Sequence, residues 1–313
     1  MSAKYGLPYK GNKSRIADWV IANLPRADTL VDLFCGGCAV THAALLSGKW
    51  NHIIANDIHG DVPQLFVDAA SGKYADEKRW ISREDFFRLK DTDAYVRLCR
   101  SFGNDGMTYM YGKAIEPWKR APHMARGCGD NSLLREMGID SDGSKEDITA
   151  HFEEYVGVLK LNQSIRSVVC LENQERAKAV KNLVQLQSLQ STTRLQSLQS
   201  LQSLQISGKD YRDVPTPSGS VVYCDIPYSC TKNNYGVAFD RHAFFDWACA
   251  QSVPVIISEY NIEDDRFAEL ASTQKVQLSG GANAQRFVTE RLYCPKEQLE
   301  TIQEMLRKDK TDE

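Results

Sequence analysis

The stretch that decides the fold is Val221-Val-Tyr-Cys-Asp-Ile-Pro-Tyr228. Its first four residues form a short apolar run, which is too brief for a helix and is typical of a buried parallel strand. Asp225 then stands at the carboxyl end of that strand, the edge at which ligands bind in open α/β sheets. Pro227 fixes its own φ and favours an extended Ile226, so the turn holds Asp225, the Ile226 carbonyl and the Tyr228 ring together.

A second unit with the same logic lies near the N-terminus. Thr29–Phe34 is an apolar and β-branched run, Cys35-Gly-Gly-Cys38 forms a turn, and Ala39–Leu46 has the pattern of a helix. Glycines let the backbone approach a ligand, and the N-terminus of a helix offers N–H donors to its anionic groups. The turn does not match the dinucleotide or P-loop patterns, so a dinucleotide or ATP site is poorly supported.

An acid at the next strand end is a candidate for binding a ribose. His52–Ala55 predicts a third strand, and Asp57 follows it. Folds of this kind hold ribose hydroxyls with an acid about twenty residues beyond the glycine turn. The alternative for Asp57 is the N-cap of a helix that begins near Asp61.

Composition limits the class of protein. The 313 residues are 42% hydrophobic and 25% charged, which suits one large domain or a domain with an insertion. The absence of a signal segment or bilayer-length apolar window predicts a cytoplasmic protein without membrane contact. Nine cysteines without framework spacing favour reduced thiols, and the Cys35–Cys38 pair lacks the second pair of a zinc site, so no metal is expected. A net charge of −3 argues against a generic nucleic-acid binder, so any such contact needs a local basic face.

The middle of the chain has a different character. Charged and helix-forming stretches dominate residues 73–181, which we expect to be a mainly helical insertion between two parts of one domain, residues 1–72 and 205–313. Its central loop interleaves cations with aromatic rings, as in surfaces that contact phosphates and bases. The alternative is a solvated basic loop. The candidate basic residues are Lys113, Lys119, Arg120 and Arg126.

Residues 182–204 contain an internal Leu-Gln-Ser repeat, with a leucine at every third position from Leu186 to Leu204 except position 192, which is a threonine. A period of three fits neither one face of a helix nor a strand of period two. We expect a linker of variable length. Elsewhere we expect a helix within Pro8–Asn23, a helix beginning near Asp240, strands at Val253–Ser258 and Thr289–Cys294, a basic loop at Gly280–Arg286 and a surface helix after Pro295.

Two of these motifs carry a resemblance to a known family. Asp225-Ile-Pro-Tyr228 resembles the Asp-Pro-Pro-Tyr tetrapeptide of Dam-type, alpha-group adenine-N6 DNA methyltransferases, with Ile226 in place of the first proline. Asp32-Leu-Phe-Cys-Gly-Gly37 resembles the S-adenosylmethionine loop of that family. The order of glycine loop, ribose acid, insertion and tetrapeptide is also similar. The resemblance implies a Rossmann-like class I methyltransferase sheet with helices on both faces, plus an inserted target-recognition domain.

The resemblance also implies a reaction, the transfer of a methyl group from S-adenosylmethionine to the N6 amine of an adenine flipped out of double-stranded DNA. Such an amine is a poor nucleophile because its lone pair is spread into the purine. Asp225 and the Ile226 carbonyl would therefore accept its hydrogens, Pro227 would fix the turn, and Tyr228 would stack on the base.

Cofactor contacts follow from the same resemblance. They fall on Tyr9, Lys13, Asp32, Phe34, Cys35, Gly36, Gly37, Asp57, Asp210 and Tyr211. Tyr9 and Lys13 would contact the methionine part, Asp210 the adenine amino group, and the Tyr211 N–H the same ring. The alternatives are a solvated first-turn lysine for Lys13 and a plain turn-forming acid for Asp210.

Two other functions are compatible with the sequence. One is methylation of an amide or amine nitrogen in RNA or protein, since related tetrapeptides serve those substrates. The other is a DNA-binding relative in which Ile226 has weakened turnover. For the first function the implied partner is double-stranded DNA, and a cognate restriction endonuclease is left open.

Overall fold

The computed structural model describes residues 5–139, 201–227, 239–278 and 285–311. The chain forms two compact units. The larger unit comprises residues 3–7, 11–71 and 192–313, and the smaller unit comprises residues 1–2, 8–10 and 72–191.

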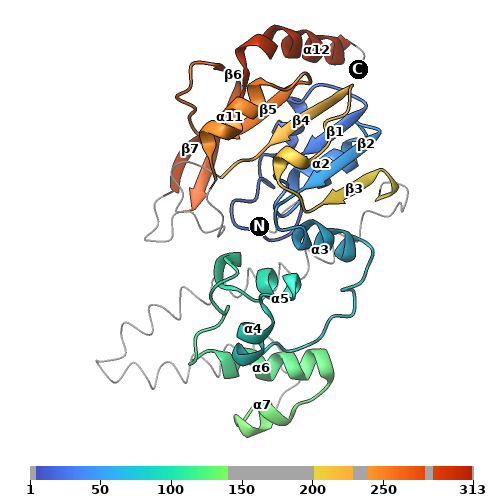
Figure 1. Ribbon diagram of the computed structural model, residues 1–313. Coiled ribbons are helices and arrows are strands. Elements are labelled where there is room, and N and C mark those ends of the chain that lie inside the picture. Colours follow the sequence, from blue (N-terminus) through green and yellow to red (C-terminus); the bar gives the residue numbers. More distant parts are fainter. Residues whose placement is uncertain (1–4, 140–200, 228–238, 279–284, 312–313) are drawn as a thin grey trace. The chain divides into compact units, whose positions relative to one another are not determined.

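The larger unit is built on a seven-stranded sheet with the order β3-β2-β1-β4-β5-β7-β6 (Figure 1). Its strands are β1 Thr29–Asp32, β2 His52–Asn56, β3 Leu204–Ser207, β4 Ser220–Cys224, β5 Val255–Glu259, β6 Phe267–Leu278 and β7 Gln285–Pro295. The first five strands in the spatial order are parallel, and β7 is antiparallel to both β5 and β6. Parallel strands joined by helices confirm the expected Rossmann-like α/β class.

Helices connect these strands. In the larger unit they are α1 Ala17–Ala22, α2 Ala39–Ser47, α3 Asp61–Ala70, α11 Arg241–Cys249 and α12 Leu299–Thr311, with 3-10 turns η4 Tyr211–Asp213 and η5 Lys296–Gln298. The helix expected near Asp240 is confirmed, because the Asp240 side chain accepts a hydrogen bond from the Ala243 N–H at 3.0 Å and caps α11. The N-terminal helix begins only at Ala17, after turns at residues 10–11 and 14–16.

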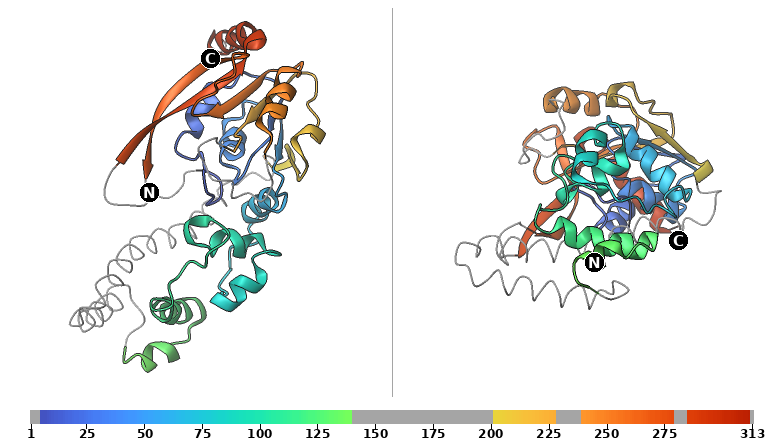
Figure 2. Two further views of the ribbon diagram at one scale, coloured as in Figure 1. Left: turned by 60° about the vertical axis from the view of Figure 1, so that its left-hand side comes forward. Right: turned by 90° about the horizontal axis from the view of Figure 1, so that it is seen from below.

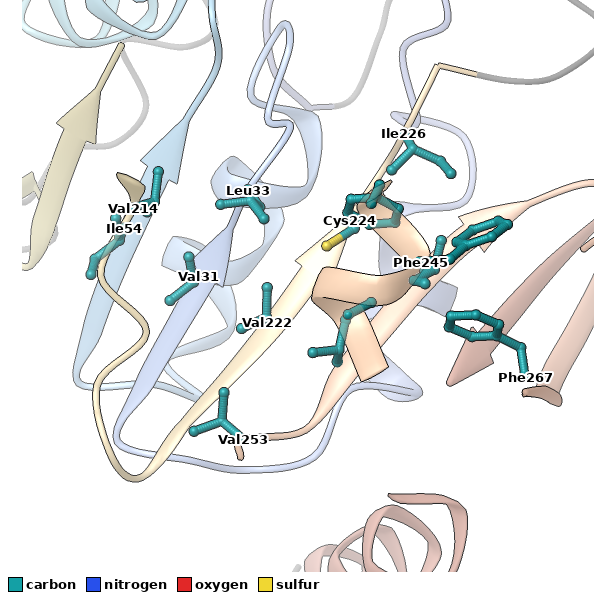
Figure 3. Packing of buried hydrophobic residues seen from close by; sticks show 14 residues of the cluster. Val31, Leu33, Ile54, Val214, Val222, Cys224, Ile226, Phe245, Val253 and Phe267 are labelled. Carbon is teal, nitrogen blue, oxygen red and sulfur yellow. The ribbon is translucent and has the colours of Figure 1, made fainter. Parts of the chain in front are cut away.

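One face of the sheet packs against α11. Val31, Val222 and Val255 are register partners across β1, β4 and β5 and are fully buried in one cluster, to which α11 contributes Phe244, Phe245 and Ala248 (Figure 3). Ile226 lies just beyond β4 and belongs to this cluster, with 1% of its side chain exposed. The core therefore extends past the strand into the turn that carries Asp225.

The other face is covered near the N-terminus. Side chains at the intervening strand positions point to the opposite side of a sheet, and Asp32 on β1 meets Thr41 of α2 there. Tyr5, Ala17, Ala39 and Ala43 form a small buried cluster that joins α1 to α2. Helices thus flank both faces, as expected.

Two features of the sheet differ from the sequence-based expectations. Strand β6 was not expected, and β7 is longer than the predicted Thr289–Cys294; together they form a long ribbon (Figure 2). Polar residues interrupt the apolar alternation of β6, so its sequence lacks the pattern of a buried strand. Strand β3 begins at Leu204, within the Leu-Gln-Ser repeat, while residues 182–200 of the repeat and 280–284 of the predicted basic loop lie outside the described residues.

The described part of the smaller unit, from residue 72 to 139, consists of short helices. They are α4 Arg83–Leu89, α5 Ala94–Cys99, η1 Phe102–Asn104, α6 Glu116–His123, the π-helix η2 Met124–Cys128 and α7 Ser132–Glu136. Ala121, Ala125, Leu134 and Ile139 form a buried cluster that holds α6, η2 and α7 together. Across the described ranges of both units, no helix is both long enough and apolar enough to cross a bilayer.

A buried histidine makes the stability of the larger unit pH-dependent. The Gly6 N–H donates to Nδ1 of His42 at 3.1 Å, so the ring must be neutral, and burial lowers its pKa to about 4. The unfolded chain binds this proton near pH 6.5, so stability is lost as pH falls from about 7 towards 4. We predict that wild type loses roughly 1–2 kcal/mol relative to His42→Asn between pH 7 and 5, measured by urea unfolding. Equal losses in both proteins would contradict this role.

Candidate active site

The glycine turn and the Asp225 turn leave the sheet side by side. Strands β1 and β4 are parallel neighbours in which Asp32 is in register with Tyr223. The pairing continues beyond β1, because the Leu33 N–H donates to the Tyr223 carbonyl at 2.9 Å. The carboxyl ends of both strands lie at one edge, so the segments that follow them share that edge.

A buried asparagine ties the neighbouring loops to this edge. The Asn56 carbonyl accepts from the Cys35 N–H at 2.8 Å, and its side-chain amide donates to the carbonyls of Leu33 and Lys209 at 3.1 and 3.0 Å. Asn56 thus joins the segments that follow β1 and β3. Sequence reasoning missed this residue, although a buried strand that ends in a polar side chain is a detectable signal.

Asp57 contacts the glycine turn directly. Its Oδ2 accepts from the Gly36 N–H at 3.0 Å, and its Oδ1 accepts from the His59 N–H at 2.9 Å. Gly36 has a φ of 46°, in the left-handed region that favours glycine. The N-cap of α3 is Gly60, so the helix-capping alternative for Asp57 is wrong. Burial raises the pKa of Asp57, and the N–H groups of His59 and Gly36 partly offset this effect.

Asp32 is a buried acid with one oxygen satisfied. Its Oδ2 accepts from the Thr41 N–H at 3.0 Å and from the Thr41 hydroxyl at 2.6 Å. Its Oδ1 is buried and has no hydrogen-bond partner among the described residues. Burial raises the pKa of Asp32 to about 7, and the nearby charge of Asp225 adds to the rise. The site can therefore accept a cationic or hydrogen-bond-donating group at Oδ1.

Lys13 forms an ion pair with Asp225. Its Nζ lies 2.5 and 2.6 Å from the two carboxylate oxygens, and the side chains of Lys13 and Asp225 are 5% and 21% exposed. The buried Glu290 lies 3.9 Å from the same Nζ and accepts from the Ser258 hydroxyl at 2.7 Å. The solvated-lysine alternative is therefore wrong. The structure brings Lys13 to the expected catalytic acid, a contact that the sequence did not predict.

Pro227 is held from the α11 side. The Pro227 carbonyl accepts from Nη2 of Arg241 at 2.5 Å, and Nη1 of Arg241 lies 3.6 Å from the buried Glu259 carboxylate. The sequence did not indicate Arg241. It is one polar residue among others at the start of a predicted helix, and nothing in that position points to a contact with Pro227. Tyr228 lies outside the described residues.

An aromatic cluster flanks the glycine turn. The half-buried rings of Phe34 and Tyr211 lie 5.8 Å apart, and Phe239, Phe244 and Trp247 pack around them. These rings offer an apolar surface beside the turn, and part of it is open to a ligand.

One expected cofactor residue, Asp210, has another local role, and a second, Tyr9, belongs to the smaller unit. The carboxylate of Asp210 accepts from the Arg212 N–H at 3.0 Å and pairs with the Arg212 guanidinium at 2.8 Å, which lowers its pKa. This is the turn-forming alternative considered for Asp210. Tyr9 is half-buried within residues 8–10, which belong to the smaller unit.

The candidate basic residues lie in the smaller unit. Lys113 and Arg120 are exposed, and Lys119 is half-buried beside Arg120 on α6. The backbone of Arg126 lies in η2, and its side chain is outside the described part of the chain.

A glycine turn next to a cation-bound carboxylate, at adjacent strand ends of a Rossmann-like sheet, is an arrangement suited to a group-transfer enzyme. The family model of the D12 class N6 adenine-specific DNA methyltransferases matches residues 9–240, and the chain belongs to that family. It is thus a DNA methyltransferase that acts on the N6 position of adenine and requires a methyl donor. A comparison with curated proteins found no match.

The buried Asp32 predicts a stability change with the opposite pH trend to that of His42. Its folded-state pKa of about 7 lies above the ordinary value of 3.8, so its favourable contribution is present at low pH and is lost as pH rises through 7. Asparagine keeps an acceptor for Thr41 and carries no charge. We predict that Asp32→Asn gains roughly 1–3 kcal/mol relative to wild type between pH 5 and pH 8, measured by urea unfolding without methyl donor. A difference that does not change with pH would show that Asp32 stays protonated or unburied.

Proposed function

We propose that the methyl donor is S-adenosylmethionine and that the substrate is an adenine flipped out of duplex DNA at a specific sequence. The observation that carries this proposal is the adjacency of the Cys35–Cys38 turn and the Asp225 turn across the β1–β4 pair. In a methyl transfer the donor and the attacking amine must meet in line, and two neighbouring strand ends can hold both.

The residues around the glycine turn fit this donor, which supplies a methyl group on a positively charged sulfur. The unsatisfied Oδ1 of Asp32 is suited to a cationic part of such a molecule. Asp57, beside Gly36, is suited to ribose hydroxyls, and the rings of Phe34 and Tyr211 to its adenine. Cys35 and Gly37 would contribute main-chain atoms to the binding site of the methyl donor. Tyr9 and Asp210 remain further candidates for this site.

Asp225 is the proposed catalytic acceptor. An ionised carboxylate has about four lone-pair positions, so Asp225 is suited to contact the Lys13 ammonium and to accept a hydrogen of an adenine amine as well. The Ile226 carbonyl supplies a second acceptor, and both stabilise positive charge as it grows on the amine nitrogen. Pro227 keeps the turn in shape. The methylated ammonium is acidic, so its proton can pass to Asp225 or to water without a stronger base.

Tyr228 is proposed to stack on the flipped base, since a base inside a duplex is closed to this chemistry. The proposed DNA-binding residues of the inserted recognition domain, residues 73–181, are Lys113, Lys119, Arg120 and Arg126, which would neutralise phosphates. The partner is then double-stranded DNA, and a cognate restriction endonuclease is a further candidate. The free thiols of the described cysteines fit the reducing cytoplasm, the proposed location.

Replacing the acceptor tests the catalytic assignment. We predict that Asp225→Ala lowers methyl transfer by about 100-fold or more, because the amine loses a preorganised acceptor. The measurement is incorporation of tritium from labelled S-adenosylmethionine into unmethylated genomic DNA. The matched control is Asp265→Ala, which removes an exposed acid before β6 and should retain wild-type counts. Counts in RNA or protein in place of DNA, or equal counts in both variants, would contradict the proposal.

Salt dependence tests the basic surface. We predict that Lys113→Ala and Arg120→Ala each weaken DNA binding and reduce the slope of log affinity against log salt by about 0.9, the value for one lost phosphate contact. Fluorescence anisotropy over a salt series measures both. Arg88→Ala provides the control, since this exposed arginine on α4 lies outside the proposed surface and should leave the slope unchanged. An unchanged slope in all three variants would exclude these residues from the DNA contact.

A further inference from the structure

The catalytic turn lacks a restraint that its resemblance to Asp-Pro-Pro-Tyr would lead one to expect. At position 226 an isoleucine stands where a proline ring would fix φ. The carbonyl of this residue is one of the two proposed acceptors, so its direction matters for the reaction. Misplacing a reacting group by about 1 Å costs on the order of 100-fold in rate. Another part of the chain must therefore hold the turn.

Arg241 contacts the turn at the residue that follows Ile226. Its Nη2 donates to the Pro227 carbonyl at 2.5 Å. The proline ring already fixes φ of residue 227, and a hydrogen bond to its carbonyl restrains ψ as well. The Ile226–Pro227 peptide plane then has little freedom on its C-terminal side, and the Ile226 carbonyl is fixed with it.

Arg241 is itself held in place. It is the first residue of α11, whose start is fixed by the Asp240 cap and whose far side is buried through Phe244 and Phe245. Nη1 lies 3.6 Å from the Glu259 carboxylate, which is 0% exposed, while the Arg241 side chain is 25% exposed. A buried carboxylate strongly favours a nearby cation, so Glu259 keeps the guanidinium in the direction that reaches Pro227.

The same helix also holds the side chain of Ile226. That side chain is 1% exposed and belongs to the cluster that contains Phe244 and Phe245 of α11 (Figure 3). Strand β5 supplies Ile257 to this cluster and Glu259 to the ion pair two positions later, so both anchors lie on one face of the sheet. The backbone and the side chain of the turn are therefore attached to one rigid body.

We propose that Arg241, oriented by Glu259, is a positioning residue for methyl transfer, which substitutes for the missing proline ring by fixing the Asp225–Pro227 turn. This inference rests on the proposed catalytic role of that turn. It assigns Arg241 to the alignment of the two acceptors. The competing assignment is a contact between Arg241 and a DNA phosphate. Loss of alignment lowers the rate at saturating DNA, whereas loss of a phosphate contact lowers DNA affinity.

The test compares Arg241→Ala and Arg241→Lys with wild type in single-turnover methylation of unmethylated genomic DNA, at saturating DNA and tritiated S-adenosylmethionine. We expect Arg241→Ala to lower the rate by about 10- to 100-fold with DNA affinity and its salt slope unchanged. Arg241→Lys keeps the charge but lacks the second terminal nitrogen of the guanidinium, so its rate should fall between those of wild type and Arg241→Ala. If Arg241→Ala does not fold, as judged by thermal unfolding, the lysine variant decides.

Arg266→Ala is the matched control, because this exposed arginine pairs with Asp264 and with Asp246 of α11 but has no described contact with the turn. It should keep the wild-type rate. The proposal is overturned if the rate of the Arg241 variants at saturating DNA stays within about twofold of wild type, with any loss confined to DNA affinity.

A double variant tests the part of Glu259. Glu259→Gln alone should lower the rate, and Arg241→Ala with Glu259→Gln should be no slower than Arg241→Ala, because the two act as a unit. Additive losses would separate Glu259 from Arg241.

Hydrogen exchange measured on the peptide over residues 223–227 gives a readout that needs no activity. This peptide should exchange faster in Arg241→Ala than in Arg266→Ala. Unchanged exchange would overturn the anchoring role even if DNA methylation is confirmed, and faster exchange would support it even if Asp225→Ala retained activity.

Discussion

The site depends on one constraint: several of its carboxylates are buried away from water, so each needs a cation or hydrogen-bond donor beside it. Asp32, Glu259 and Glu290 are almost completely buried near the edge that carries Asp225, and an unpaired charge in such surroundings is costly. Lys13 lies between Asp225 and Glu290, and Arg241 lies beside Glu259. The two cations offset three of the carboxylates. The buried oxygen of Asp32 is left for a group that the protein does not supply among its described residues.

This distribution of charge explains how a short turn can be positioned accurately. Lys13 holds the side chain of Asp225 from the N-terminal segment, while Arg241 and the core hold the main chain of residues 226 and 227 from α11. The anchors come from segments far apart in the chain, and the parallel strands β1, β4 and β5 bring them to one edge. An adenine N6 methyltransferase needs such rigidity because its catalytic groups act by direction and distance.

The sequence predicted the parts of this arrangement that are encoded locally. Apolar runs identified β1, β2, β4 and β5, a helix was expected near Asp240 where α11 begins, and the order of motifs identified the family. The sequence did not predict contacts between residues that are distant along the chain, because periodicity carries no information on which side chains meet. The Lys13–Asp225 pair, separated by 212 positions, and the Arg241–Pro227 bond are of this kind. Strand β6 was missed because its sequence is largely polar. It forms a strand by pairing with β7, and local propensity does not report such pairing.

Strand β3 has an evolutionary consequence that arises from where it begins. Its first residues, Leu204 and Gln205, repeat the letters of the triplets before them, and the Ser203 carbonyl accepts from the Ile53 N–H at 2.9 Å. If replication slippage deletes or duplicates one triplet, the same Ser-Leu-Gln letters still precede Ile206. The number of Leu-Gln-Ser units can therefore change in frame, while the residues that form β3 at the edge of the sheet keep their composition and pairing.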